Sequence, residues 1–117
     1  MIRNFTSVAL LLILLAACAK SDSAMTAYRS GDFATALREF RPRADQGDAQ
    51  AQYILGVMYT EGDGVPRDYS QAASWFKMAA EHGDSEAQFN LGFMYANGRG
   101  VPEDDAEAVR WYRLAAE

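Results

Sequence analysis

The strongest constraint on the fold of this chain is an internal repeat with a period of 36 residues. When residues 48–81 are laid on residues 84–117, 17 of the 34 aligned pairs are identical. A period between about 20 and 50 residues is typical of stacked arrays, in which each unit buries its apolar face against its neighbours. The repeat therefore predicts a stack of small units, each about 36 residues long.

Each repeat contains two stretches with helical periodicity. In the first stretch, apolar residues recur at i, i+4, i+7 and i+8, which places them on one face of a helix. In residues 48–83 they are Ala51, Leu55, Met58 and Tyr59. The second stretch has similar spacing, with Ala72, Trp75, Phe76, Ala79 and Ala80. We therefore predict one helical hairpin per repeat.

Glycine and aspartate mark the predicted helix ends. Gly62 and Gly98 lie where the first helix of each repeat would end in a left-handed turn. Each hairpin is predicted to begin with an aspartate that follows a glycine and caps the helix, at Asp32, Asp48 and Asp84. The second helices are predicted to begin with a reciprocal capping box, at Asp68 with Gln71 and at Asp104 with Glu107.

A degenerate copy precedes the two clear repeats. At the same shift of 36, four of its residues match the next copy: Ala36, Phe40, Ala44 and Gly47. Its first helix is expected around 24–29 and is followed by a shorter connection. We therefore predict an all-α solenoid of about three hairpins, with a degenerate hairpin at 24–47 and repeats at 48–83 and 84–117.

The recurrent residues resemble the Sel-1-like repeat family and cover nearly all of residues 24–117. They are Ala51, Gln52, Leu55, Gly56 and Tyr59, then Gly62, Gly64, Val65, Pro66 and Asp68, then Ala72, Trp75, Phe76, Ala79 and Ala80. The resemblance implies a right-handed superhelix of antiparallel helix pairs that acts as an adaptor between proteins. It supplies no shared catalytic residue. The first hairpin is closer to a plain tetratricopeptide unit.

The N-terminus has the pattern of an export signal. Arg3 precedes an apolar run at 8–15, and small residues lead to Cys18. The segment around Cys18 resembles a bacterial lipobox, which implies cleavage after residue 17, a lipid on Cys18 and a tether over 18–23. In a Gram-negative host this implies an outer-membrane lipoprotein that faces the periplasm. The alternative is an ordinary secretory cleavage site that releases a soluble periplasmic or secreted protein.

Composition argues against several classes of function. The formal net charge is −5, and the sequence has no cluster of basic residues of the kind that binds the phosphates of nucleic acid. Cys18 is the only cysteine and His82 the only histidine, so no disulfide within the chain, thiol zinc site or Cys–His pair is expected. We predict no catalytic residue, no metal and no cofactor. Cysteine-rich members of the resembled family are associated with binding or hydrolysing β-lactams, but the absence of cysteines after Cys18 disfavours that alternative.

Positions that differ between the two clear repeats are the candidates for recognition, because positions that must stack stay the same. On the first helices, which line the concave side of such superhelices, these candidates are Gln50, Tyr53, Ile54, Val57, Glu86, Phe89, Asn90 and Phe93. The recurrent residues predicted to form the scaffold include Leu55, Gly56, Tyr59, Trp75, Leu91, Gly92, Tyr95 and Trp111. The expected partner is a segment of another protein, although packing between hairpins is an equally good reading of Phe89.

The sequence stops at Glu117 without the glycine and aspartate that follow Glu81. Terminal repeats usually carry a polar cap. This ending leads us to expect either end-to-end self-association or a shortened version of a longer array.

Overall fold

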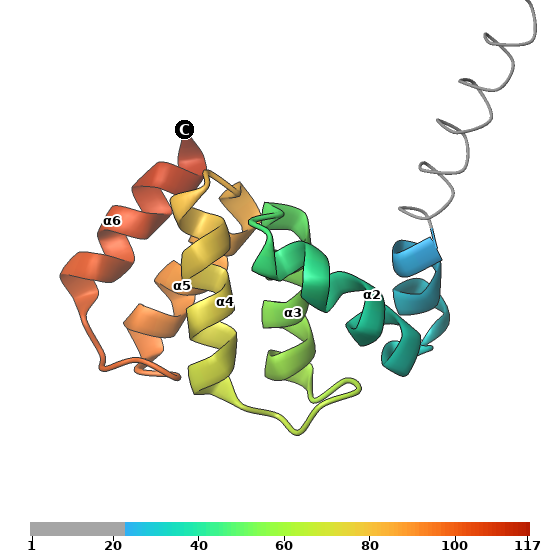
Figure 1. Ribbon diagram of the computed structural model, residues 1–117. Coiled ribbons are helices and arrows are strands. Elements are labelled where there is room, and N and C mark those ends of the chain that lie inside the picture. Colours follow the sequence, from blue (N-terminus) through green and yellow to red (C-terminus); the bar gives the residue numbers. More distant parts are fainter. Residues whose placement is uncertain (1–22) are drawn as a thin grey trace, which may run out of the picture. The chain divides into compact units, whose positions relative to one another are not determined.

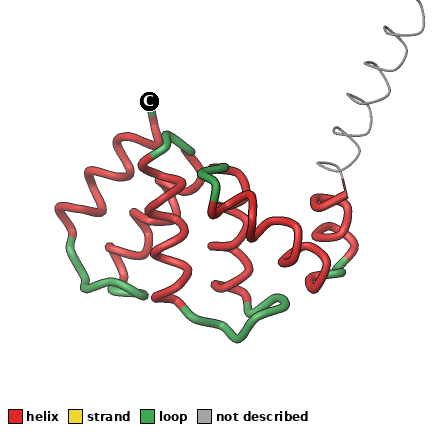
Figure 2. Tube along the Cα trace, viewed as in Figure 1, coloured by secondary structure: helices red, strands yellow, loops and turns green. Residues whose placement is uncertain are grey.

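The computed structural model describes residues 23–117 and contains helices and loops but no strand within that range (Figure 2). The helices after residue 32 are α2 (Phe33–Asp45), α3 (Ala49–Glu61), α4 (Tyr69–Glu81), α5 (Ser85–Asn97) and α6 (Asp105–Ala116) (Figure 1). Residues 23–30 are helical as well. The predicted all-helical architecture is thereby confirmed. The expected signal peptide, Cys18 and all but the last residue of the tether lie outside the described residues.

The chain divides into two compact units, Met1–Ala36 and Leu37–Glu117. In the described part of the first unit, the rings of Tyr28 and Phe33 meet edge to face with centroids 5.8 Å apart. Asp32 caps the start of α2 by accepting a hydrogen bond from the Thr35 N–H at 3.3 Å. The ring contact connects the helix at 23–30 to the first turn of α2. No helix in the described part of the chain is both long and apolar enough to span a bilayer.

The second unit contains most of α2 and the two clear repeats. Helix α3 packs against α4, α5 packs against α6, and α4 joins the two hairpins by packing against α5. Leu55, Met58 and Leu91 are at most 1% exposed, and the two tryptophans, Trp75 and Trp111, are 8% and 4% exposed. The recurrent side chains therefore fill the interfaces between helices, both within and between the hairpins, and burial of their apolar surface stabilises the stack.

The helix ends form largely as the sequence predicts. Gly62 and Gly98 end α3 and α5 in the left-handed conformation, with φ of 73° and 62°. The four predicted aspartates of the second unit each cap a helix by accepting a backbone N–H: Asp48, Asp68, Asp84 and Asp104. These caps satisfy N–H groups that have no partner within the helix.

The prediction of a reciprocal capping box is wrong in its second half. The backbone N–H of Asp68 donates to the Tyr59 carbonyl at 2.9 Å, and that of Asp104 donates to the Tyr95 carbonyl at the same distance. Each cap N–H is thus satisfied by the preceding helix, and the Gln71 or Glu107 side chain is not needed there. This bond ties the end of each loop back to the first helix of its hairpin.

A recurrent glutamine links successive hairpins. The Gln52 side chain donates from Nε2 to the Ala44 carbonyl, and Gln88 donates in the same way to the Ala80 carbonyl, both at 3.1 Å. Both glutamines are buried. A buried amide without a hydrogen bond costs stability, so these bonds favour the packing of each new hairpin on the last turn of the helix before it.

Candidate functional site

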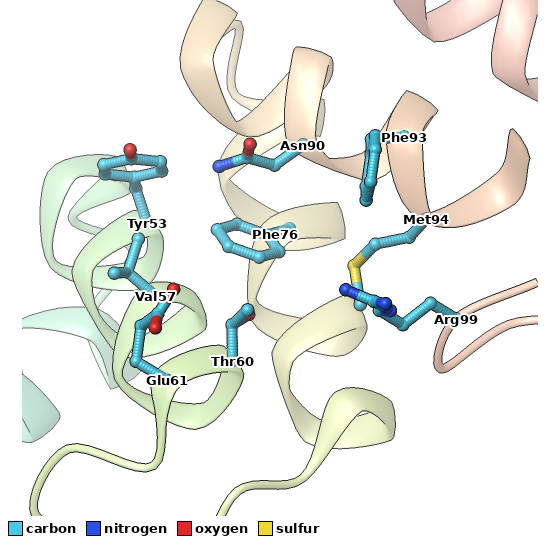
Figure 3. A pocket seen from close by; sticks show the side chains of 9 residues that line it. All are labelled: Tyr53, Val57, Thr60, Glu61, Phe76, Asn90, Phe93, Met94 and Arg99. Carbon is cyan, nitrogen blue, oxygen red and sulfur yellow. The ribbon is translucent and has the colours of Figure 1, made fainter. Parts of the chain in front are cut away.

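A hollow of about 250 Å³ lies between α3 and α5 (Figure 3). Its floor is the ring of Phe76 from α4, which is 3% exposed. One wall comes from α3, with Tyr53, Val57, Thr60 and Glu61. The other comes from α5 and its following loop, with Asn90, Phe93, Met94 and Arg99. We call this hollow the apolar pocket.

Glycine explains why the pocket has an aromatic floor. A Cβ atom at Gly56 would come within 2.6 Å of two carbons of the Phe76 ring, so only glycine allows the ring to lie so close to α3. The same packing recurs one repeat later, where a Cβ at Gly92 would lie 2.9 Å from the Tyr112 ring. The sequence therefore places one aromatic ring against a helical glycine in each hairpin.

A second hollow of about 400 Å³ adjoins the apolar pocket, and both are lined by Tyr53 and Asn90. Its other lining residues are Ser85, Glu86, Phe89, Ala115 and Ala116. The rings of Phe89 and Tyr112 have centroids 5.5 Å apart, which repeats the pairing of Tyr53 with Phe76 at 5.8 Å. We call this second hollow the acidic pocket and refer to the two pockets together as the groove.

The Tyr53 hydroxyl lies in an acidic environment. Burial raises its pKa, and Glu86 raises the pKa further, both through its charge and as a hydrogen-bond partner. Asp84 adds a smaller contribution in the same direction, while a hydrogen bond with Asn90 acts in the opposite direction. The hydroxyl therefore keeps its proton at neutral pH and remains a hydrogen-bond donor.

Arg99 lies at the opposite end of the apolar pocket from this acidic environment. Its guanidinium lies over the Tyr69 ring, 4.8 Å from the centroid, and 5.9 Å from the centroid of Phe93. Glu61 lines the same pocket from the α3 side (Figure 3). This end of the groove therefore presents both signs of charge.

Six of the eight residues predicted to contact a partner line the groove: Tyr53, Val57, Glu86, Phe89, Asn90 and Phe93. Gln50 is exposed but lines neither pocket. The assignment of Ile54 to the recognition surface is wrong, because its side chain is 6% exposed and belongs to the core. Burial of the isoleucine side chain stabilises the fold. In the next repeat, the equivalent residue is Asn90, which lines the groove.

The predicted scaffold residues lie in or against the core. Six of them are buried: Leu55, Gly56, Trp75, Leu91, Gly92 and Trp111. Tyr59 and Tyr95 are half-buried and pack against the core of the second unit.

The sequence comparison between repeats missed three residues of the apolar pocket, Phe76, Met94 and Arg99. Thr60 and Glu61 also line it, and they do differ between the repeats, but they were not among the predicted contacts. Phe76 and Met94 belong to recurrent core positions, so nothing distinguished them from scaffold. A signal existed for Arg99, since it replaces Asp63 between the same two glycines and reverses the charge at that position. Within the described residues, no group of three or more His, Cys, Asp or Glu side chains is placed to hold a metal ion.

Comparison with known proteins identifies the repeat. The model of the Sel1 repeat family matches residues 49–84 and again 85–117, which is more than half of the chain. The chain belongs to the Sel1 repeat family. Sel1 repeat proteins generally act as scaffolds for interactions between proteins, and the fold is generally non-catalytic.

Solved Sel1 repeat structures share this fold. A Sel1 repeat protein from Oxalobacter formigenes has a TM-score of 0.77 and 35% identity, over 80% of this chain and 39% of its own. A protective antigen of uropathogenic Escherichia coli with an SLR fold has a TM-score of 0.76 and 44% identity, over 90% of this chain and 25% of its own. Cysteine rich protein B of Helicobacter pylori has a TM-score of 0.66 over 68% of this chain and 60% of its own, and its 22% identity shows the fold alone.

Curated relatives match over a shorter stretch. DAP3-binding cell death enhancer 1 of Rattus norvegicus and of Mus musculus are each 41% identical to this chain over 44 residues. The match covers 38% of this chain and 9% of each relative. The similarity therefore concerns the repeat and not the whole of those proteins.

Proposed function

We propose that this Sel1 repeat protein is a non-catalytic scaffold of the bacterial envelope, and that its groove holds a segment of another protein. The observation that carries the proposal is the groove itself. Side chains that differ between the repeats gather there, at the surface, over a floor that the recurrent residues build. Helical repeats of this type use such extended surfaces for binding.

The exposed aromatic side chains support a binding role. Phe89 is 55% exposed and Phe93 is 43% exposed, which leaves much of both rings in water. Tyrosine, phenylalanine and arginine are enriched in protein interfaces, where buried aromatic anchors supply much of the affinity. Phe93, Tyr53 and Arg99 provide these residue types around one pocket.

The envelope location is a proposal that rests on the sequence of the N-terminus. A lipid on Cys18 would hold the repeats at a membrane, and the modification of bacterial lipoproteins supplies several acyl chains at one point. Two or more anchoring signals give stable membrane attachment where a single chain gives only marginal binding.

A pull-down from native envelope preparations tests the groove. The bait is the lipid-anchored wild-type chain, compared with a Val57→Glu, Phe93→Glu double variant that places two charges in the apolar pocket. The matched control is Met78→Glu, because Met78 is an exposed apolar residue, at 40%, that lines neither pocket. We expect the wild type and the control to recover the same partner and the double variant to lose it. Equal recovery by all three would show that the groove does not bind the partner.

A further inference from the structure

The two pockets of the groove differ in chemistry and are joined at Tyr53 and Asn90. The apolar pocket is lined by Val57, Phe76 and Phe93, and can receive one bulky apolar side chain. The acidic pocket contains the Glu86 carboxylate and is lined by no basic residue.

Charge in the groove is unequally distributed. At the end near Arg99, Glu61 provides a compensating negative charge, so neither sign of ligand is favoured there. At the other end, the negative charges of Glu86 and Asp84 both raise the pKa of Tyr53. Within the described residues, neither carboxylate forms an ion pair with a lysine or arginine. The chain as a whole carries a net charge of −5. The uncompensated charge of the groove is therefore negative and lies at the acidic pocket.

The spacing of the acidic and aromatic side chains along α5 follows from helix geometry. Glu86 and Phe93 are two turns apart on α5, so they share a face and lie about 10 Å apart along the axis. A polyproline II segment brings residues i and i+3 to the same side at a separation of roughly 9 Å. The two distances agree.

We propose that the groove binds an extended segment of a partner protein that carries a bulky apolar residue and a basic residue three positions apart. The apolar residue occupies the pocket over Phe76, and the basic residue meets Glu86 beside Tyr53. This inference deepens the proposed scaffold function and rests on it. It specifies the chemistry of the partner, which the scaffold role alone leaves open.

Designed peptides test the inference by fluorescence polarisation at low ionic strength. The probes are labelled proline-rich peptides of equal length, because proline favours the polyproline II conformation. The first has one leucine and one lysine three positions apart. In two others the lysine is replaced by serine or by glutamate, and in the last the leucine is replaced by serine. We expect the leucine–lysine peptide to bind about three- to fivefold tighter than the leucine–serine peptide, as for a single partly exposed ion pair.

Two variants assign the effect to the acidic pocket. Glu86→Gln introduces the residue that the preceding repeat has at the equivalent position, Gln50, and is expected to remove the preference for lysine. Asp105→Asn is the matched control, since it removes one exposed negative charge that lines neither pocket, and the preference should remain. Thermal unfolding of both variants checks that the fold is unchanged.

The outcomes separate this inference from the proposed function. If the leucine–glutamate peptide binds as tightly as the leucine–lysine peptide, or if Glu86→Gln keeps the preference, the inference is wrong, and binding that still requires leucine would leave the scaffold role standing. Failure of all the peptides to bind also overturns the inference. The pull-down with the Val57→Glu, Phe93→Glu variant then decides the scaffold role independently.

Discussion

At the scale of single residues, helical glycines determine the shape of the groove. Gly56 and Gly92 are both buried within helices, where glycine costs about 1 kcal/mol relative to alanine. That cost is offset by the close approach of an aromatic ring in each hairpin. Phe76 is enclosed by its neighbours, at 3% exposed, whereas Tyr112 is half-buried.

We predict that Gly56→Ala destabilises the protein by about 1–3 kcal/mol, because the added methyl group overlaps the Phe76 ring and overpacks the core. Gly92→Ala should cost less, since the Tyr112 ring can move toward solvent. Urea unfolding followed by circular dichroism measures both changes. A Gly56→Ala protein as stable as the wild type would show that α3 and α4 are not held at this distance.

Single residues also show what the sequence could and could not predict about the groove. Tyr53 and Phe93 were found because they differ between repeats at positions that face outward. Ile54 differs in the same way but is buried, and periodicity alone does not reveal how far a neighbouring element covers a helix face. Phe76 was missed because it belongs to the core and to the pocket at once.

At the scale of helices, the ends were predictable to within a few residues because their chemistry is local. An aspartate after a glycine fixes the start of α3 and of α5, and Gly62 and Gly98 fix their ends. The bonds from the Asp68 and Asp104 N–H groups to the preceding helix were not predictable, because they join residues that are distant in sequence and depend on how the loop folds back. The same is true of the hydrogen bonds from Gln52 and Gln88.

One helix start gives a pH prediction. The Asp48 carboxylate caps α3 and forms an ion pair with Arg43 at 2.9 Å. Partial burial pushes the pKa of Asp48 up, but hydrogen bonds from the Ala51 N–H and from Arg43 outweigh it, so the pKa lies below its usual value. Since the folded-state pKa is lowered, the stability it contributes is present above the unfolded pKa of about 4 and is lost as the pH falls through the folded value.

Asp48→Asn should keep the cap, because asparagine is an equally good N-cap residue, and lose the ion pair. We expect a loss of at most about 1 kcal/mol at pH 7 that shrinks toward zero as the pH falls through the lowered folded-state pKa of Asp48. Urea titrations of the wild type and the variant at several pH values measure this. Asp84→Asn is the control, since the position equivalent to Arg43 in its repeat is Ala79, which cannot form an ion pair. A difference between wild type and Asp48→Asn that stays constant with pH would contradict the assignment.

At the scale of the whole molecule, the period of 36 residues predicts stacked units, and the helical spacing of apolar residues within each period predicts that these units are helical hairpins. The repeat does not determine where the protein works or what it binds. Attachment to the envelope and end-to-end self-association therefore remain predictions.

Replacing Cys18 tests the envelope attachment. In a Gram-negative host, the wild-type chain should incorporate labelled palmitate and sediment with the membranes. Cys18→Ser should be unlabelled, because the site of lipid attachment is gone. A wild-type chain that is soluble and unlabelled would instead support the ordinary secretory cleavage site.

The most direct test of the central claim, that the groove is where the protein binds its partner, is site-specific photo-crosslinking in the native envelope. A photoreactive amino acid replaces Val57 inside the apolar pocket or, in a parallel chain, Met78 outside it. We predict a discrete crosslinked product from position 57 that is absent from position 78. The same product from both positions, or a product from position 78 alone, would contradict this account.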